Sequence, residues 1–245
     1  MIEPKPIQVG PVLLPLTWLI LWLLIWFGGK IADHFFGKKE EKFRWSEVLF
    51  EATLLFLIFL KLSPILWNPQ VVIDQPATLL YGFGSSGGAV LAAILSGLYI
   101  WWKGKKAGIS WPLLLDGIAL TALIVGIGYS LFFQQLGEVT SLPWGIGVEG
   151  GKYNYHPINF YRGLWLTLIF ILWWQFVREG EQGRTYSLVM IAGGLGMLFI
   201  SYVEYHPISS SWGLQINQWA FVLLAIIGWI LRTFQTKLGG KKGAL

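Results

Sequence analysis

The sequence predicts an all-α integral membrane protein with about seven transmembrane helices. Of its 245 residues, 55% are hydrophobic and only 13% are charged, and the mean hydropathy is +0.59. These values lie outside the usual range of soluble globular domains. Apolar runs of roughly 20 residues, the length that a helix needs to cross a bilayer, recur along the chain between short polar loops. We therefore expect a single transmembrane domain over residues 1–245.

Seven apolar segments are long enough to be spans. We place them at about 11–29, 46–67, 79–102, 111–135, 158–177, 187–204 and 218–232. The first span follows Glu3 and Lys5 and has neither a basic leader nor a small-residue cleavage pattern. We therefore expect it to remain as a membrane helix and not to be removed as a signal peptide.

The basic residues are distributed unevenly between the loops. Fourteen of the 18 Lys and Arg residues lie in four segments, namely 28–46, 102–111, 177–187 and the tail from Arg232. The loops of the other side hold only Lys5 and Lys152. By the positive-inside rule, the N-terminus is outside and the C-terminus is cytoplasmic. Because the basic clusters are short and juxtamembrane, we read them as topology signals and expect no nucleic-acid partner.

Six ionisable residues fall within or at the edges of the predicted spans: Glu47, Glu51, Lys61, Asp116, Arg162 and Glu204. An unpaired charge there costs at least about 2.5 kcal/mol, so these side chains should form pairs or line a wet cavity. We expect Arg162 to pair with Glu204. Lys61 is expected to pair with Glu51 or Asp116. Internal salt bridges and a polar cavity for a lipid headgroup or an ion both remain open.

The residue types exclude several functions. The chain has no cysteine, which excludes disulfides, thiolate metal sites and a cysteine nucleophile. The last span has no lysine that retinal would need. The three histidines, His34, His156 and His206, lie at predicted helix ends and not at matching depth, which argues against a bis-histidine haem. We expect no metal and no cofactor apart from a bound phospholipid.

The tetrapeptide YHPI occurs twice, at 155–158 and at 205–208, and places His156 and His206 directly before prolines. A residue before proline favours an extended backbone, so both histidines are expected at helix boundaries on the outer surface. The outer loops 137–157 and 205–217 are the longest on that side and combine aromatic, glycine and proline residues. We expect these loops to carry outside contacts.

Eight short stretches occur in a recognisable order along the chain. They are IQVGPVLLPLTW, FLKLSPILWNP, SSGGAVLAAIL, SWPLLLDGIAL, SLPWGI, HPINFYRGLW, LFISYVEYHP and LQINQW. Together they resemble, nearly from end to end, the motifs of the prolipoprotein diacylglyceryl transferase family. HPINFYRGLW, for example, is similar to the family's H-P-x-Q-L-Y-E signature. The resemblance implies a seven-span enzyme of the bacterial cytoplasmic (inner) membrane that moves diacylglycerol from phosphatidylglycerol to a lipobox cysteine.

The resemblance, together with the ionisable residues, gives a set of candidates for a lipid site or cleft: Lys61, Ser85, Ser86, Gly87, Gly88, Asp116, His156, Tyr161, Arg162, Glu204, His206 and Gln218. His156 with Pro157 matches the family's own motif. His206 falls where the family usually carries an arginine before proline. The two copies of YHPI are therefore read as two different sites.

The chain departs from the family pattern at the positions that the reaction uses. Serine replaces the histidine of the family's H-G-G stretch. Where the family has two arginines, this chain has Gly126 and Ile200. Tyr129 and Gln134 replace an asparagine and an acid, and Arg162 replaces the glutamate after the signature tyrosine. These changes remove the expected cations for a phosphate and the usual base near neutral pH.

We therefore expect a catalytically degenerate transferase-like scaffold that binds membrane lipids, or an accessory subunit that assembles with other membrane proteins. The first alternative is a divergent active transferase, in which Arg162, Lys61 and His206 supply the lost charges. The second is a small ion or solute transporter that uses Glu51, Lys61, Asp116 and Glu204 as a path.

Overall fold

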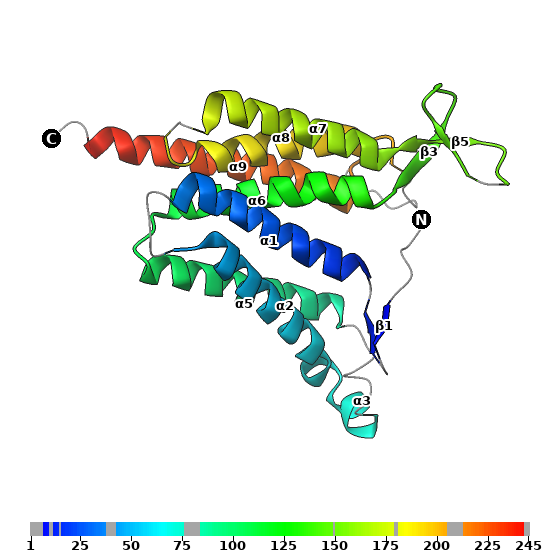
Figure 1. Cartoon of the computed structure of the whole chain (residues 1–245), viewed down its shortest axis with the longest axis horizontal. Coiled ribbons are helices and arrows are strands. Elements are labelled where there is room, and N and C mark those ends of the chain that lie inside the picture. Colours follow the sequence, from blue (N-terminus) through cyan, green and yellow to red (C-terminus); the bar gives the residue numbers. More distant parts are fainter. Residues whose placement is uncertain are drawn as a thin grey trace. The chain divides into compact units, whose positions relative to one another are not determined.

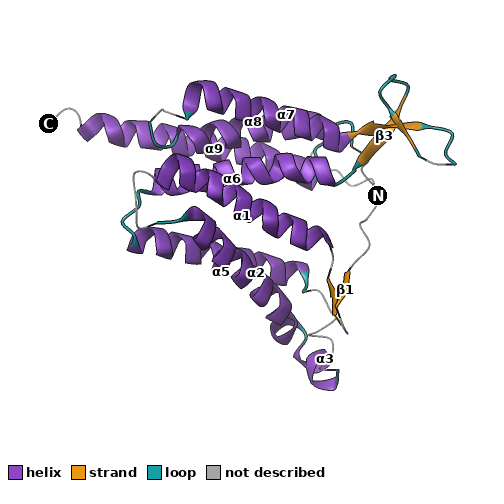
Figure 2. Cartoon of the chain, in the orientation of Figure 1, coloured by secondary structure: helices purple, strands orange, loops and turns teal. Residues whose placement is uncertain are grey.

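In the part of the chain that the structure describes, most residues are helical and the strands form two small sheets (Figure 2). The computed structural model describes residues 7–9, 12–14, 16–37, 43–75, 84–148, 150–178, 181–204 and 213–242. These residues group into two compact units that divide between Leu114 and Leu115. The predicted all-α membrane class is confirmed, whereas the two small sheets were not predicted.

Seven helices in the described part of the chain have 15 residues or more. They are α1 (Leu16–Phe36), α2 (Trp45–Trp67), α5 (Ser86–Lys106), α6 (Trp111–Phe132), α7 (Ile158–Leu172), α8 (Arg184–Ser201) and α9 (Ile216–Lys242) (Figure 1). A short helix, α3 (Pro69–Asp74), follows α2, and a π-helical turn, η2 (Trp173–Val177), continues α7. Of the seven long helices, all but α5 have the length and hydropathy to cross a membrane, with α7 and η2 together forming one span, Ile158–Val177. The α5 helix is 21 residues long but richer in glycine, serine and lysine.

The first helix begins later than the predicted start at residue 11. Strand β1 (Ile7–Val9) pairs antiparallel with β2 (Val12–Leu14), so α1 starts only at Leu16 and continues to Phe36. Prolines at positions 11 and 15 oppose a helix across this segment, which explains the hairpin.

The helix of the third predicted span, 79–102, also begins later than residue 79. Residues 79–83 of that span lie outside the described residues. The α5 helix starts at Ser86, because the Ser85 hydroxyl accepts a hydrogen bond from the Gly88 amide at 3.1 Å and caps it. The other predicted ends lie within ten residues of the observed ones. The largest of these differences is the C-terminal end of α9 at Lys242 instead of 232.

The first unit is built on α2, which packs against both α1 and α5. At the α1–α2 connection, Asp33 accepts hydrogen bonds from the Ser46 amide and hydroxyl, and Trp22 stacks on Phe50 at 4.5 Å. The α2–α5 contact is close: a Cβ on Gly88 would overlap with Ser63, so the absence of a side chain at Gly88 allows the approach. These contacts order the three helices of this unit.

The second unit consists of α6 to α9 with a three-stranded sheet. Leu123, Leu166 and Ile169 form a buried core between α6 and α7, and residues of α8 pack on it. The contact of α8 with α9 is tight, since a Cβ on Gly194 would lie 2.6 Å from the Phe221 carbonyl oxygen. The Trp173 indole in η2 donates to Thr185 Oγ1 at 3.0 Å and joins this turn to α8.

The segment predicted as an outer loop, 137–157, contains three strands. They are β3 (Leu136–Thr140), β4 (Ile146–Gly147) and β5 (Asn154–Pro157), in the order β3-β5-β4, and they extend from the start of α7 (Figure 1). The α6 helix accordingly ends at Phe132, before the predicted 135. The Glu138 amide donates to the Val203 carbonyl at 3.0 Å, so the sheet ties the start of α7 to the end of α8.

Candidate functional site

Five polar side chains lie together at the end of the α6–α9 unit that carries the sheet. We call this group the outer cluster; it consists of Gln135, Arg162, Ser201, Glu204 and Gln218. They come from the segment before β3, the second turn of α7, the end of α8 and the first turn of α9. The cluster thus joins parts of the chain that are far apart in the sequence.

An ion pair forms the centre of the outer cluster. Arg162 Nη2 donates to Glu204 Oε1, and Arg162 Nη1 donates to Gln135 Oε1 at 2.8 Å. The Glu204 side chain is only 8% exposed and that of Arg162 is 23% exposed, so the pair is largely shielded from solvent. The predicted Arg162–Glu204 pair is confirmed. Arg162 Nε is buried and has no hydrogen-bond partner among the described residues.

Neutral polar side chains extend the cluster to the start of α9. Gln218 Nε2 donates to Ser201 Oγ at 3.1 Å, and its Oε1 accepts from the Gln215 amide at 2.9 Å. Ser201 in turn donates to the Leu198 carbonyl within α8. The candidate Gln218 therefore lies at the outer cluster, where it fixes the beginning of α9.

The candidates His156 and Tyr161 form a second group near the same end of the unit. The Trp144 indole donates to the Tyr161 hydroxyl at 2.9 Å, and the Tyr161 hydroxyl lies 3.0 Å from His156 Nδ1. When the tyrosine donates its proton to Nδ1, a neutral His156 carries its own proton on Nε2. No sequence pattern predicts the contact of Trp144 with Tyr161.

The candidates Ser85, Ser86, Gly87 and Gly88 lie in the other unit, at the start of α5. The Ser85 hydroxyl is occupied as the helix cap, whereas Ser86 is exposed. A Cβ on Gly87 would lie 3.0 Å from the Trp67 indole nitrogen, and Gly88 packs on Ser63. Lys61 is half-buried on the same part of α2 as Ser63. Within this unit the structure therefore brings the serine–glycine stretch next to α2.

The candidate Asp116 lies at the opposite end of the α6–α9 unit and is 2% exposed. Its Oδ2 accepts from the Gly183 amide at 2.5 Å and its Oδ1 from the Tyr186 amide at 2.8 Å. These amides belong to the first turn of α8, whose unpaired N–H groups favour a carboxylate. Asp116 therefore caps α8 and does not join the outer cluster.

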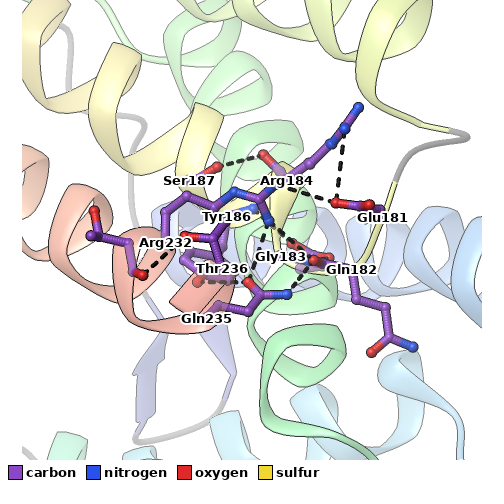
Figure 3. Close-up of polar contacts among 11 residues, drawn as sticks. Glu181, Gln182, Gly183, Arg184, Tyr186, Ser187, Arg232, Gln235 and Thr236 are labelled. Atoms are coloured by element: carbon purple, nitrogen blue, oxygen red, sulfur yellow. Dashed lines mark hydrogen bonds and ion pairs between the residues drawn. The ribbon is translucent and has the colours of Figure 1, made fainter. Parts of the chain in front are cut away.

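A polar network surrounds the capped start of α8 (Figure 3). Gln235 Nε2 donates to the Gln182 carbonyl at 2.5 Å, and the Tyr186 hydroxyl donates to Gln235 Oε1 at 3.2 Å. Gly183 has a φ of +88°, and a Cβ there would overlap with Gln235, so both its conformation and its surroundings require glycine. No sequence pattern predicts this network, because its members are neutral polar residues without periodic spacing.

Both carboxylates considered for Lys61 have other partners. Glu51 accepts hydrogen bonds from the Tyr99 hydroxyl and from Lys103 Nζ, the latter at 3.0 Å, while Asp116 binds the two backbone amides. His206 lies outside the described residues. Among those described, no group of three His, Asp or Glu side chains is arranged to hold a metal ion.

Comparison with known proteins gives one consistent family. The family model for prolipoprotein diacylglyceryl transferase matches residues 19–234. The chain is 27% identical over 223 residues to the phosphatidylglycerol–prolipoprotein diacylglyceryl transferase of Pseudomonas paraeruginosa, covering 83% of this chain and 80% of that protein. It is 25% identical over 185 residues to the enzyme of the same name from Clostridium tetani, covering 71% of each chain.

A third relative is the phosphatidylglycerol–prolipoprotein diacylglyceryl transferase 2 of Streptomyces coelicolor. It is 27% identical over 164 residues, which cover 61% of this chain and 52% of that protein. The family match extends from α1 to α9 and includes both units. With its membrane-spanning helices and bacterial relatives, this is a multi-pass protein of the bacterial inner membrane, and it belongs to the prolipoprotein diacylglyceryl transferase family.

Proposed function

We propose that this protein is a catalytically degenerate member of its family that serves as a lipid-binding scaffold or as an accessory subunit of a larger membrane complex. The observation that carries the proposal is the closed Arg162–Glu204 pair. Arg162 stands where the family's signature has a glutamate, and two of its donors are already taken by Glu204 and Gln135. A guanidinium so occupied is a poor substitute for an arginine that holds a phosphate.

The packing around Gly126 supports the same proposal. This glycine occupies the place of one of the two family arginines, and a Cβ there would lie 2.8 Å from Leu166 Cδ1 in the α6–α7 core. An arginine at position 126 would have to displace that core leucine. The other arginine is replaced by Ile200 near the end of α8. This chain thus has a glycine and an isoleucine at the two places where the family pattern has cations.

The serine–glycine stretch is the third support. A serine hydroxyl does not accept a proton near neutral pH as a histidine does. Ser85 is also occupied by the Gly88 amide, which leaves only Ser86 exposed in the place of the family's histidine. A group that forms the attacking thiolate is therefore absent from this position.

The relatives suggest which lipid to test. The Pseudomonas and Clostridium relatives are named as transferases that use phosphatidylglycerol. We infer that a scaffold derived from the same fold keeps affinity for this lipid after losing the transfer reaction.

The test is a transfer assay with the purified full chain in vesicles that contain phosphatidylglycerol, with a lipobox peptide as acceptor. The Pseudomonas paraeruginosa enzyme is the positive control. We expect no diacylglyceryl peptide from this chain under conditions in which the control converts the peptide. Native mass spectrometry of the protein, gently released from its own membranes, then tests the subunit role through the proteins that accompany it.

A divergent active transferase is the second candidate, favoured by the retained His156–Tyr161 pair of the family signature. In that case the chain converts the peptide, and Arg162→Gln or Ser86→Ala abolishes conversion while Lys152→Gln does not. Lys152 is a matched control because it carries the same charge in the exposed part of the sheet segment. Conversion with this pattern of variants contradicts the proposal of a degenerate scaffold.

A further inference from the structure

Two arginines converge on a single oxygen atom at the basic end of the α6–α9 unit. Arg232 Nη2 lies 3.6 Å from Glu181 Oε2, and Arg184 Nη2 lies 3.8 Å from the same atom (Figure 3). Both distances exceed those of a good charge-assisted hydrogen bond, about 2.7–2.9 Å. The two guanidinium groups therefore surround a point that one anionic oxygen occupies without binding tightly to either.

The position of Arg232 is fixed by the polar network beside it. Its Nη1 donates to the Gln182 carbonyl at 3.4 Å and lies 3.5 Å from Gln235 Oε1. Gln182 and Gln235 are in turn bonded to each other. Nη1 is thus used within the protein, and Nη2 is directed at the oxygen of Glu181. This guanidinium is positioned before any ligand arrives, which reduces the entropic cost of binding.

Glu181 is held less firmly than the arginines that it neutralises. Its side chain is 75% exposed, compared with 23% for Arg232 and 46% for Arg184. An exposed pair of this kind contributes little to stability. A stronger anion with several oxygen atoms can therefore take the place of this carboxylate at small cost.

The location of the arginines determines which anion is available. The loop segment 177–187 and the tail from Arg232 belong to the basic, cytoplasmic side of the chain. Arg178 lies over the Trp174 ring at 4.5 Å, and paired aromatic and basic side chains of this kind mark a membrane interface. The cytoplasmic leaflet carries anionic lipids whose phosphates attract such residues.

We propose that Arg184 and Arg232 form a binding site for the phosphate of an anionic phospholipid headgroup in the cytoplasmic leaflet, from which Glu181 is displaced. The guanidinium groups bind the phosphate oxygens, and Gln182 and Gln235 keep Arg232 in place. This site lies at the other end of the unit from the outer cluster, so the inference does not depend on the proposed function.

The experiment titrates the full chain in detergent with phosphatidylglycerol or phosphatidylcholine and follows bound lipid by native mass spectrometry. We expect Arg184→Gln and Arg232→Gln each to weaken the first phosphatidylglycerol by about tenfold, because each removes a charge-assisted contact. Arg44→Gln is the matched control, since Arg44 is another basic-side arginine that is paired with one exposed glutamate, Glu47. It should change the affinity less than about twofold.

The carboxylate variant predicts an effect of opposite sign. Glu181→Gln should strengthen phosphatidylglycerol binding several-fold, whereas Glu47→Gln, which removes the same charge elsewhere, should not. Because Glu181 is exposed, this variant tests the site even if Arg232→Gln fails to fold. Unchanged binding on Glu181→Gln, or equal losses for Arg184→Gln and Arg44→Gln, overturns the proposal.

Two further arms identify the source of the phosphate and the end of the unit that binds it. Inorganic phosphate that displaces the lipid at equal concentration would assign the arginine pair to a free anion and overturn the headgroup assignment; the proposal expects it to compete only at much higher concentration. Loss of the bound lipid on Arg162→Gln but not on Arg184→Gln would locate it at the outer cluster and also overturn the inference.

Discussion

The two ends of the α6–α9 unit bury a carboxylate in different ways. Asp116 is bound by two backbone amides at the start of α8, whereas Glu204 is bound by a guanidinium from α7. The first arrangement needs only a helix N-terminus and serves the same purpose whatever the protein does. The second needs a partner side chain of opposite charge, 42 residues away in the sequence. The comparison teaches that, in this unit, a buried carboxylate is informative about function only where its partner is a side chain and not the backbone.

The largest loss of stability should come from breaking the Arg162–Glu204 pair of the outer cluster. Arg162→Leu or Glu204→Leu leaves one largely buried charge without its partner, which typically costs about 3 kcal/mol or more. We expect each single variant to lower the free energy of unfolding by that amount in detergent, and the double variant to lose less than the sum. Denaturant titration followed by tryptophan fluorescence measures all three.

The exposed pair Arg44–Glu47 provides the control for this comparison of single and double variants. Its side chains are 65% and 61% exposed, so Arg44→Leu and Glu47→Leu should each cost less than about 1 kcal/mol. Additive losses at Arg162 and Glu204, equal to the sum of the single variants, would contradict the view that these two residues act as a closed pair.

The second-largest loss of stability is expected at the opposite end of the α6–α9 unit, where Asp116 caps α8. Asp116→Ala leaves the buried amides of Gly183 and Tyr186 without acceptors, and each orphaned group costs about 1–3 kcal/mol. We expect the variant to unfold at a lower denaturant concentration and Asp116→Asn, which keeps one acceptor oxygen, to lie between it and the wild type. Hydrogen exchange should increase first in the first turn of α8. If Asn and Ala were equally destabilising, the loss would come from charge and not from capping.

The smallest effect concerns the hydrogen-bonded group beside the outer cluster. Trp144→Phe removes one N–H donor to the Tyr161 hydroxyl and should cost about 1 kcal/mol. The change should stay local and appear as faster hydrogen exchange in β5 without a shift of the global unfolding midpoint beyond that amount. Trp101→Phe, at an exposed aromatic over which Lys105 lies, is the control. A midpoint shift as large as that of Asp116→Ala would show that Trp144 supports the core.

Hydropathy predicted the helices because apolar runs of membrane length have few alternative structures. Arg162 and Glu204 were paired correctly because two opposite charges at predicted rims need each other. Asp116 stays a candidate for a lipid site or cleft; in the structure its partners are backbone amides, which are the same for every residue and leave no mark in the sequence. Hydropathy does not distinguish such a cap from a ligand.

Other differences have local causes. The strands within 137–157 are short, two to five residues each, and lack the alternation that identifies a strand. The start of α5 can be predicted from the sequence, because a serine followed by Ser-Gly-Gly is a suitable N-cap. That Ser86, His156 and Arg162 do not support diacylglyceryl transfer stays a prediction, which the transfer assay tests.

During membrane insertion, the two residues of the Arg162–Glu204 pair are synthesised at different times. The guanidinium emerges from the ribosome 42 residues before the carboxylate that neutralises it, and by the predicted topology it has to cross the bilayer to reach the outer side. A lone arginine opposes that passage, because a charge in the bilayer without a partner costs at least about 2.5 kcal/mol. The charge of Arg162 can therefore be neutralised by its partner only after α8 and Glu204 have also been synthesised.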